Sequence, residues 1–263
     1  MVRGLDVFRR YFADHADQFV LIGGTAATLA MEEAGLEFRA TKDLDIVLHI
    51  EALKPAFGDL FWKFVEAGRY ANREVSDSNK PVFYRFNKPA DERFPAMLEL
   101  FCRAPDGIKL AAGSHLTPIP IDEAVASLSA ILLDDAYYEF ILAGRREVDG
   151  LPWVGEDRLI PLKASAWLDL SERQAKGEKV DTKNIRKHAN DVLRLSQLLA
   201  PDSRIAVAAR IAEDLDRFLA GIQSDRSIDP KSLRLSGSVA KIAERIARAY
   251  NLSRIAKPDT ESA

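Results

Sequence analysis

Two carboxylates one residue apart are the side chains of this sequence best suited to chemistry. Asp43 and Asp45 stand at the start of an apolar run that reaches Leu48. Side chains at positions i and i+2 of a β-strand point to the same side, so a strand here would place both carboxylates on one face. Mg²⁺ is typically held by one or two carboxylates together with phosphate oxygens of a substrate. The pair therefore predicts metal-dependent chemistry on a phosphate compound.

A glycine pair lies upstream of these carboxylates. The apolar run 19–22 ends in Gly23-Gly24-Thr25, and an alanine-rich segment that we expect to be a helix follows. Glycines let the backbone approach a phosphate closely, and the first N–H groups of a helix can donate to an anion. Together the two motifs predict a site for a nucleoside triphosphate and its metal ion.

A third carboxylate, Glu99, lies in the run Met97–Cys102, which we predict to be a strand because of its apolar content. If this strand lies beside the strand of the Asp pair, then Asp43, Asp45 and Glu99 converge and could hold one or two Mg²⁺ or Mn²⁺ ions. The alternative is that Asp43 caps the entry to its strand and Asp45 faces solvent.

The surrounding elements predict an α/β fold. Short strands and helices alternate through residues 5–68, and the runs 82–86 and 97–102 predict an antiparallel pair of strands. We expect residues 69–80 to be irregular, and residues 137–142 to form a hairpin with the segment around Asp149-Gly150. From Pro161 the pattern is mainly helical. The prediction is an α/β domain with a small mixed sheet over residues 1–155, a helical domain over 156–256, and a disordered tail over 257–263.

Composition is that of an ordinary soluble protein. The formal net charge is −3, so any contact with nucleic acid must come from a local patch. The single Cys102 excludes an intrachain disulfide and fits a reducing compartment. Residues 1–18 lack the apolar core of a secretory signal, and no apolar run reaches membrane-spanning length. We therefore expect a cytoplasmic protein without a membrane partner.

The combination of Gly23-Gly24-Thr25 with Arg39-x-Thr41-x-Asp43-x-Asp45 resembles the nucleotidyltransferase superfamily of the DNA polymerase β type, and more narrowly the AbiEii/AbiGii toxin-related group. The resemblance is strongest over residues 18–50. It implies that the Gly23–Thr25 segment cradles the triphosphate, with the Thr25 hydroxyl on a phosphate. It also implies that Asp43, Asp45 and Glu99 are the catalytic carboxylates and metal ligands. Two departures are a longer gap before Asp43 and a Glu where the third carboxylate is usually Asp.

A second group of candidates lies in the helical half. Lys163 is followed by Lys187 and Asp191, and the same resemblance implies that Lys163 touches the triphosphate, with Lys187 and Asp191 in the nucleotide site. The alternative is that Lys187 and Asp191 form an ordinary surface pair at i, i+4. Arg39 and Thr41 would bind nucleotide, or Arg39 would merely solvate its loop.

The predicted activity is transfer of a nucleoside monophosphate from an NTP to a hydroxyl acceptor, RNA such as tRNA or a protein, with an antitoxin as a possible partner of a toxin-like enzyme. Two alternatives stay open, an aminoglycoside-type enzyme acting on a small molecule and a catalytically silent binding module. Lys241, Arg245 and Arg248 lie on one side of the last predicted helix. That run could meet RNA or be a solvated helix face.

Overall fold

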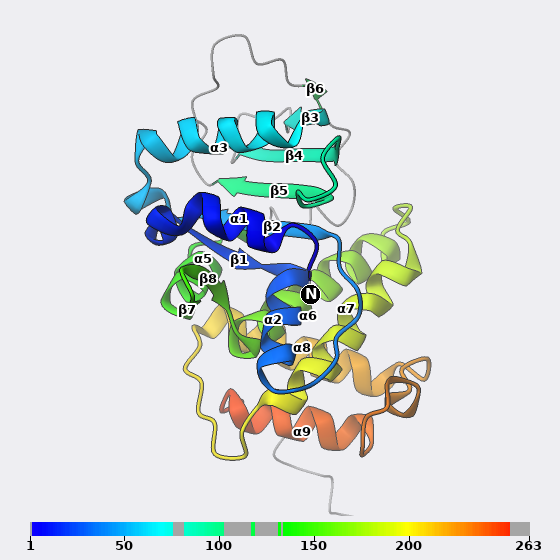
Figure 1. Cartoon of the computed structure of the whole chain (residues 1–263). Coiled ribbons are helices and arrows are strands. Elements are labelled where there is room, and N and C mark those ends of the chain that lie inside the picture. Colours follow the sequence, from blue (N-terminus) through cyan, green and yellow to red (C-terminus); the bar gives the residue numbers. More distant parts are fainter. Residues whose placement is uncertain (1, 76–81, 103–116, 119–130, 133, 253–263) are drawn as a thin grey trace, which may run out of the picture. The chain divides into compact units, whose positions relative to one another are not determined.

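The computed structural model describes residues 2–75, 82–102, 117–118, 131–132 and 134–252 (Figure 1). The chain divides into two compact units, Met1–Gly155 and Glu156–Ala263. The tail predicted over residues 257–263 lies outside the described residues. No helix within the described ranges is long and apolar enough to cross a membrane.

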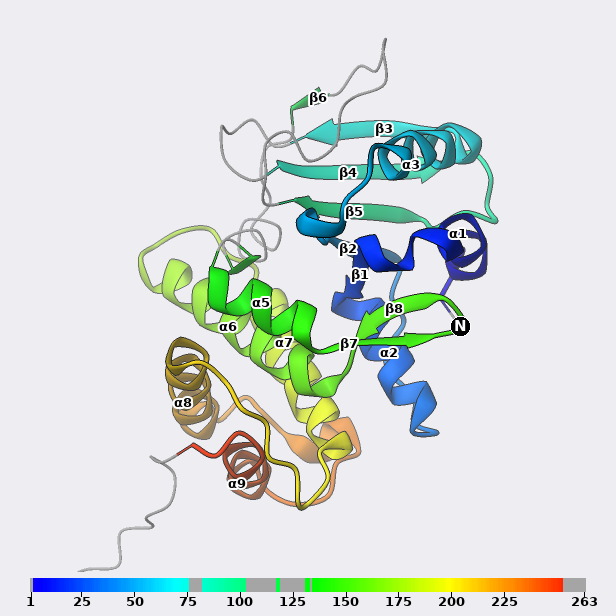
Figure 2. The ribbon, with the colours of Figure 1, turned by 90° about the vertical axis from the view of Figure 1, so that its left-hand side faces the viewer.

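The first unit is built on one mixed β-sheet, whose described strands follow the order β6-β3-β4-β5-β2-β1-β8-β7 (Figure 2). The strands pair in parallel at β2/β5, β1/β8 and β3/β6, and antiparallel elsewhere. Their bounds are β1 (Phe19–Ile22), β2 (Asp43–Leu48), β3 (Tyr70–Val75), β4 (Val82–Pro89), β5 (Met97–Cys102), β6 (Thr117–Pro118), β7 (Arg145–Val148) and β8 (Leu151–Val154). The α/β class agrees with the prediction, but the sheet is larger than the small sheet expected.

An aromatic layer joins the helices of this unit to the sheet. Helices α1 (Leu5–Phe12) and α3 (Pro55–Gly68) lie across one face of the sheet in Figure 1. Phe8 and Phe64 meet edge to face at 5.5 Å between ring centroids, and Phe61 meets Phe86 of β4 at 5.6 Å. Such pairs add to the large apolar area that each ring removes from water. One face of the sheet is thereby covered, and Asp45 and Glu99 lie on the other face.

Two segments differ from the sequence prediction because of local chemistry. Residues 137–142 belong to a helix, α5 (Asp135–Ala143), since Asp134 caps it by accepting from the N–H groups of Ala136 and Tyr137. The predicted Asp-Gly turn does form, but between β7 and β8. Asp149 and Gly150 have φ of 53° and 73°, the positive values that a type I′ hairpin turn requires at both central residues.

Residues 70–75, expected to be irregular, form strand β3 and pair with β4. The sequence of this segment has no clear alternation of apolar and polar residues, so the prediction did not detect the strand.

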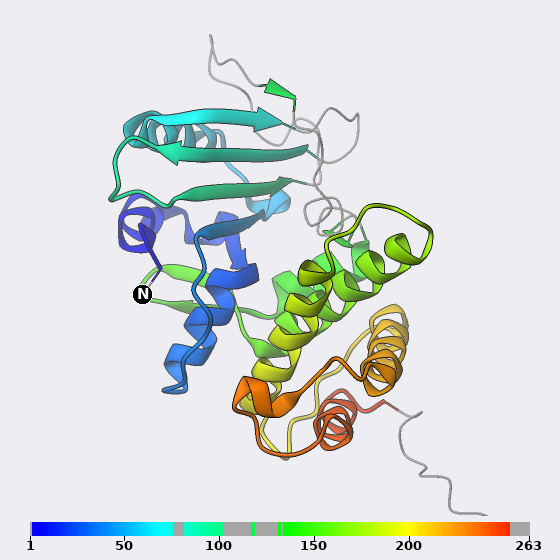
Figure 3. The ribbon, with the colours of Figure 1, turned by 90° about the vertical axis from the view of Figure 1, so that its right-hand side faces the viewer.

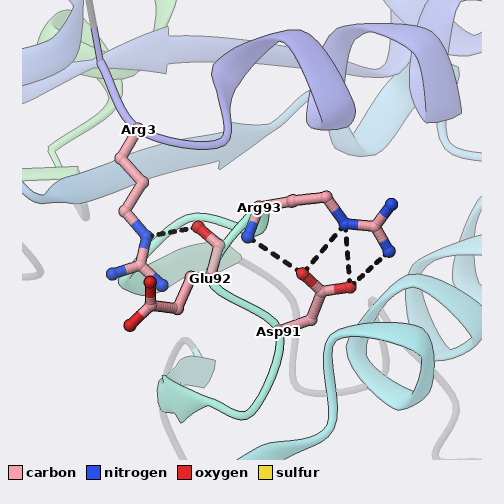
Figure 4. A network of polar contacts seen from close by, with 4 residues as sticks. All are labelled: Arg3, Asp91, Glu92 and Arg93. Carbon is pink, nitrogen blue, oxygen red and sulfur yellow. Dashed lines mark hydrogen bonds and ion pairs between the residues drawn. The ribbon is translucent and has the colours of Figure 1, made fainter.

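The connection from β4 to β5 is tied to the N-terminal segment (Figure 4). Arg3 Nε donates to the carbonyls of Glu92 at 2.7 Å and Phe94 at 3.1 Å. Arg93 binds both oxygens of Asp91, at 2.7 Å from Nη2 to Oδ2, and these hydrogen bonds lower the pKa of Asp91 to about 2. These hydrogen bonds hold residues 91–94 in place shortly before β5 begins at Met97.

The second unit is helical, with α6 (Glu156–Ala175), α7 (Thr182–Leu195), α8 (Ala209–Ser224) and α9 (Val239–Ala249). Trp167 of α6 meets Phe218 of α8 edge to face at 5.4 Å. A Cβ at Gly221 would lie 2.5 Å from the Trp167 ring, so a larger residue there would push α8 away from α6.

Helix α6 begins before the proline that was expected to mark its start. Leu159 and Ile160 are already helical, and Pro161 lies inside the helix. Pro161 has no N–H, so the carbonyl of Asp157 loses its normal helical donor. The Tyr250 hydroxyl donates to that carbonyl at 2.8 Å. Tyr250, directly after α9, thus replaces the donor that Pro161 lacks, and the helix continues through the proline.

Candidate functional site

Parallel pairing of β2 with β5 places two carboxylates side by side. Asp45 is directly opposite Glu99 in the register of the two strands. Both side chains are buried, with residue exposures of 9% for Asp45 and 7% for Glu99. Leu44 and Ile46 alternate with the carboxylates and pack on the covered face of the sheet. The prediction that these two strands lie together is confirmed, and Asp45 and Glu99 share one face.

Arg85 extends this row onto a third strand. It lies opposite Glu99 in the antiparallel register of β4 and β5. Its Nε and Nη2 donate to Glu99 Oε1 at 2.9 and 2.8 Å. Sequence reasoning missed Arg85, although its parity within the predicted antiparallel pair of strands could have placed it beside Glu99.

Burial and like charge together alter the protonation of this row. Burial, the neighbouring Asp45 charge and a hydrogen bond to Asp45 together raise the pKa of the Glu99 carboxyl to about 9, while Arg85 opposes the shift. The two side chains thus interact directly, and Glu99 keeps its proton well above the usual pH range of a glutamate. A proton held between two buried carboxylates occupies the place where a cation could bind instead.

Gly23 packs directly against the Asp45 carboxylate. It has φ of 68°, in the left-handed region, and opens helix α2 (Gly23–Glu33) directly after β1. A Cβ at this position would overlap Asp45 Oδ2. Only glycine both adopts this backbone conformation without strain and leaves the space that Asp45 fills. The N-terminus of α2 therefore lies against Asp45.

Gly24 and the segment before β2 form the next contact. A Cβ at Gly24 would lie 2.5 Å from Thr41 Oγ1 and 3.8 Å from Arg39 Nη2. The Arg39 guanidinium also lies over the Phe38 ring at 5.4 Å. The structure thus brings Arg39 and Thr41 to the backbone of Gly24, as the nucleotide-site prediction requires.

Thr25 has a different place from the one the resemblance implies. Its side chain is fully buried, and its hydroxyl donates to the carbonyl of Asp43 at 2.8 Å. This bond fastens α2 to the first residue of β2. The geometry assigns Thr25 a positioning role, since a fully buried hydroxyl is not presented to a ligand.

The three predicted metal ligands differ in how they are held. Asp43 is half-buried at the start of β2, Asp45 lies against Gly23, and Glu99 is shared between Asp45 and Arg85. Within the described ranges, no three His, Cys, Asp or Glu side chains are grouped closely enough to hold a metal ion. The expected three-carboxylate ligand set is not assembled, since Arg85 engages Glu99. Asp43 and Asp45 are oxygen donors of the kind that Mg²⁺ and Mn²⁺ prefer, and they lie beside the first turn of α2.

In the second unit, Lys163 and Asp191 form a buried ion pair. Lys163 Nζ donates to Asp191 Oδ2 at 2.8 Å, and the side chains are 8% and 0% exposed. Arg194 Nη1 lies 4.0 Å from the other carboxylate oxygen. Asp191 is thus buried against α6, which does not fit the alternative of a surface pair with Lys187. Lys187 itself is exposed on α7.

Comparison with protein-family models, with curated proteins and with solved structures finds no match to this chain.

Proposed function

We propose that this chain is a metal-dependent nucleotidyltransferase of the DNA polymerase β type. The observation that carries the proposal is the Asp45–Glu99 pair, two buried carboxylates that interact directly, beside the glycine pair at the N-terminus of α2. A cation between the carboxylates would remove their mutual repulsion. The N–H groups at the start of α2 could donate to a phosphate.

The candidate site residues of the first unit have separate roles in this proposal. Asp43 and Asp45, with Glu99 once it is released from Arg85, would hold Mg²⁺ or Mn²⁺. When bound there, the ion would supply Lewis-acid stabilisation of charge on the α-phosphate. The N–H groups at Gly23 and Gly24 would orient the triphosphate. Arg39 would neutralise part of its charge.

The reaction would be an in-line displacement. The acceptor hydroxyl oxygen forms a bond to the α-phosphorus, the bond from that phosphorus to the bridging oxygen breaks, and pyrophosphate leaves. The hydroxyl proton would pass to an ionised carboxylate, and Glu99, which lies beside Asp45, is proposed for this role.

Label transfer tests the activity and identifies the acceptor. Purified protein is incubated with labelled NTPs and separate cellular pools of RNA, protein and small molecules. Label in RNA or protein supports the toxin-like version with its antitoxin partner, and label in small molecules supports the aminoglycoside-type version. The D43N/D45N variant should transfer nothing. D59N/E66Q removes the same charge from exposed positions of α3 and should keep full activity. Transfer by D43N/D45N at the wild-type rate would refute the assignment.

A catalytically silent nucleotide-binding module is the second candidate, and the Arg85–Glu99 ion pair favours it. Arg85 already supplies a cation to the carboxylate row at 2.8 Å. Calorimetry with an NTP, with and without Mg²⁺, separates the candidates. Equal affinity in both conditions supports the silent module, while binding that requires Mg²⁺ supports the enzyme.

A further inference from the structure

The two units carry opposite charge. Residues 156–263 contain 20 Lys and Arg against 16 Asp and Glu, whereas residues 1–155 contain 17 against 24. The net charge of −3 therefore conceals a basic helical unit. A local basic surface attracts polyanions even when the whole chain is acidic.

The excess charge is concentrated along α7. Its exposed residues include Lys183, Arg186 and Lys187, and Arg194 continues the row as a half-buried residue. Asp191, the only carboxylate within the bounds of α7, is buried with Lys163. From Lys183 to Arg194 the cations span about 17 Å at 1.5 Å per residue. The outer side of α7 is thus a cationic ridge without an exposed carboxylate.

Helix α9 continues the positive charge beyond the end of α7. Arg245 Nη1 donates to the carbonyl of Ser196, at 3.4 Å, directly after α7 ends. Lys241 and Arg248 are exposed on the same side of α9 as Arg245, with Glu244 as the one acidic residue in that helix. The η4 segment (Pro230–Leu233) also contacts α7, and Figure 3 shows α7, η4 and α9 within this unit. We define the basic face as Lys183, Arg186 and Lys187 of α7 with Lys241, Arg245 and Arg248 of α9.

The composition of the basic face favours a polynucleotide over a membrane or a protein. The exposed large apolar side chains of the described residues are Tyr11, Leu36 and Val148, none of which lies in the helical unit. A membrane-binding helix needs apolar residues to insert, and a protein interface is typically centred on buried aromatic anchors. Closely spaced cations with amide groups such as Asn190 and Gln197 instead suit phosphate and sugar oxygens.

We propose that the basic face binds the sugar–phosphate backbone of RNA. The choice of RNA over DNA rests on the proposed function, in which RNA is the nucleic acid named as a candidate acceptor. The presence of a phosphate-binding surface rests on the charges alone. Binding is sequence-independent and weakens steeply with salt, because each phosphate contact releases a counterion.

Fluorescence anisotropy of labelled single-stranded RNA with the full-length protein tests this proposal over a salt series. The K183Q/R186Q and K241Q/R248Q variants should each bind about tenfold more weakly at low salt, and each lost contact should reduce the slope of log K against log[salt] by about 0.7. K176Q/K179Q removes the same charge from the exposed segment after α6 and should bind as the wild type does.

The outcomes separate this proposal from the proposed function. D43N/D45N should keep wild-type RNA affinity whether or not the chain is an enzyme, because the basic face does not include the carboxylates. The proposal is overturned if the wild type does not bind RNA at low salt, or if K176Q/K179Q loses as much affinity as the face variants. Tighter binding to DNA of equal length, or to vesicles of anionic lipid, would overturn the choice of RNA.

Discussion

At the scale of single residues, the row Asp45–Glu99–Arg85 determines what the site can do. Three strands contribute one charged side chain each, and both carboxylates are buried. Asp43, Asp45 and Glu99 were identifiable from the sequence because strand parity places them on one face. Arg85 was missed: strand parity could suggest its face, but its place directly opposite Glu99 depends on the register between β4 and β5.

Gly23 should tolerate alanine less well than another left-handed glycine does. Gly35 has φ of 70°, and a Cβ added there would have nothing within 4 Å, whereas a Cβ at Gly23 overlaps Asp45. Gly35→Ala should cost about 1 kcal/mol of stability through backbone strain alone. Gly23→Ala should cost a further ~1–3 kcal/mol through overpacking. Urea unfolding of both variants measures the difference, and equal losses would show that Asp45 does not occupy the space over Gly23.

The raised pKa of Glu99 has a consequence for stability. An unfolded Glu loses its proton near pH 4.5, but the folded protein holds that proton up to about pH 9. Unfolding therefore releases a proton within this window, and stability falls as pH rises, by at most about 1.4 kcal/mol per pH unit for one proton. Urea unfolding at several pH values should show this slope in the wild type and a reduced slope in E99Q. An unchanged slope in E99Q would assign the proton to another group.

At the scale of elements, a helix cap and a distant hydrogen bond account for two predictions that were wrong. Residues 137–142 have the aromatic content of a strand, yet the Asp134 cap makes them helical. Pro161 suggested a helix start, yet α6 passes through it because Tyr250, far along the chain, supplies a donor. The pattern of residues around each segment does not show how strongly Asp134 caps its helix, or that the hydroxyl of Tyr250 lies near Pro161. The Asp149-Gly150 turn was predictable because its two residues alone determine the turn type.

The Tyr250 hydroxyl and Pro161 should be coupled energetically. Tyr250→Phe leaves the buried carbonyl of Asp157 without its hydroxyl donor and should cost about 1–3 kcal/mol. In a Pro161→Ala background, the alanine N–H can donate to the same carbonyl, so Tyr250→Phe should cost less. A double-mutant cycle by thermal unfolding measures this coupling. Additive losses would mean that Tyr250 does not replace the donor that Pro161 lacks.

The Lys163–Asp191 pair should be sensitive to loss of one partner. Lys163→Met leaves the fully buried Asp191 carboxylate without its nearest cation and should cost about 3–5 kcal/mol. Replacing both residues by apolar ones, as in K163M/D191L, should recover much of that loss. Lys176→Met, which breaks an exposed pair with Glu172, is the matched control and should change stability little. If Lys163→Met behaves like the control, the buried pair contributes nothing to the fold.

At the scale of the whole chain, chemistry and charge are divided between the two units. The first unit holds the carboxylates and the glycine pair, and the second carries the basic face. The sequence alone indicated the carboxylates, the glycine pair and the cations of α9, but not the whole cationic row of α7. It did not show that α7 has no exposed carboxylate, because that depends on the burial of Asp191 against α6.

Calorimetry with Mn²⁺ and a non-hydrolysable NTP analogue is the most direct test of the proposed metal site at Asp45. We expect the wild type to bind the analogue only when Mn²⁺ is present. D45N should lose this binding, and D59N should retain it. Binding of equal strength with and without Mn²⁺, unchanged in D45N, would contradict the assignment of Asp45 to a metal site.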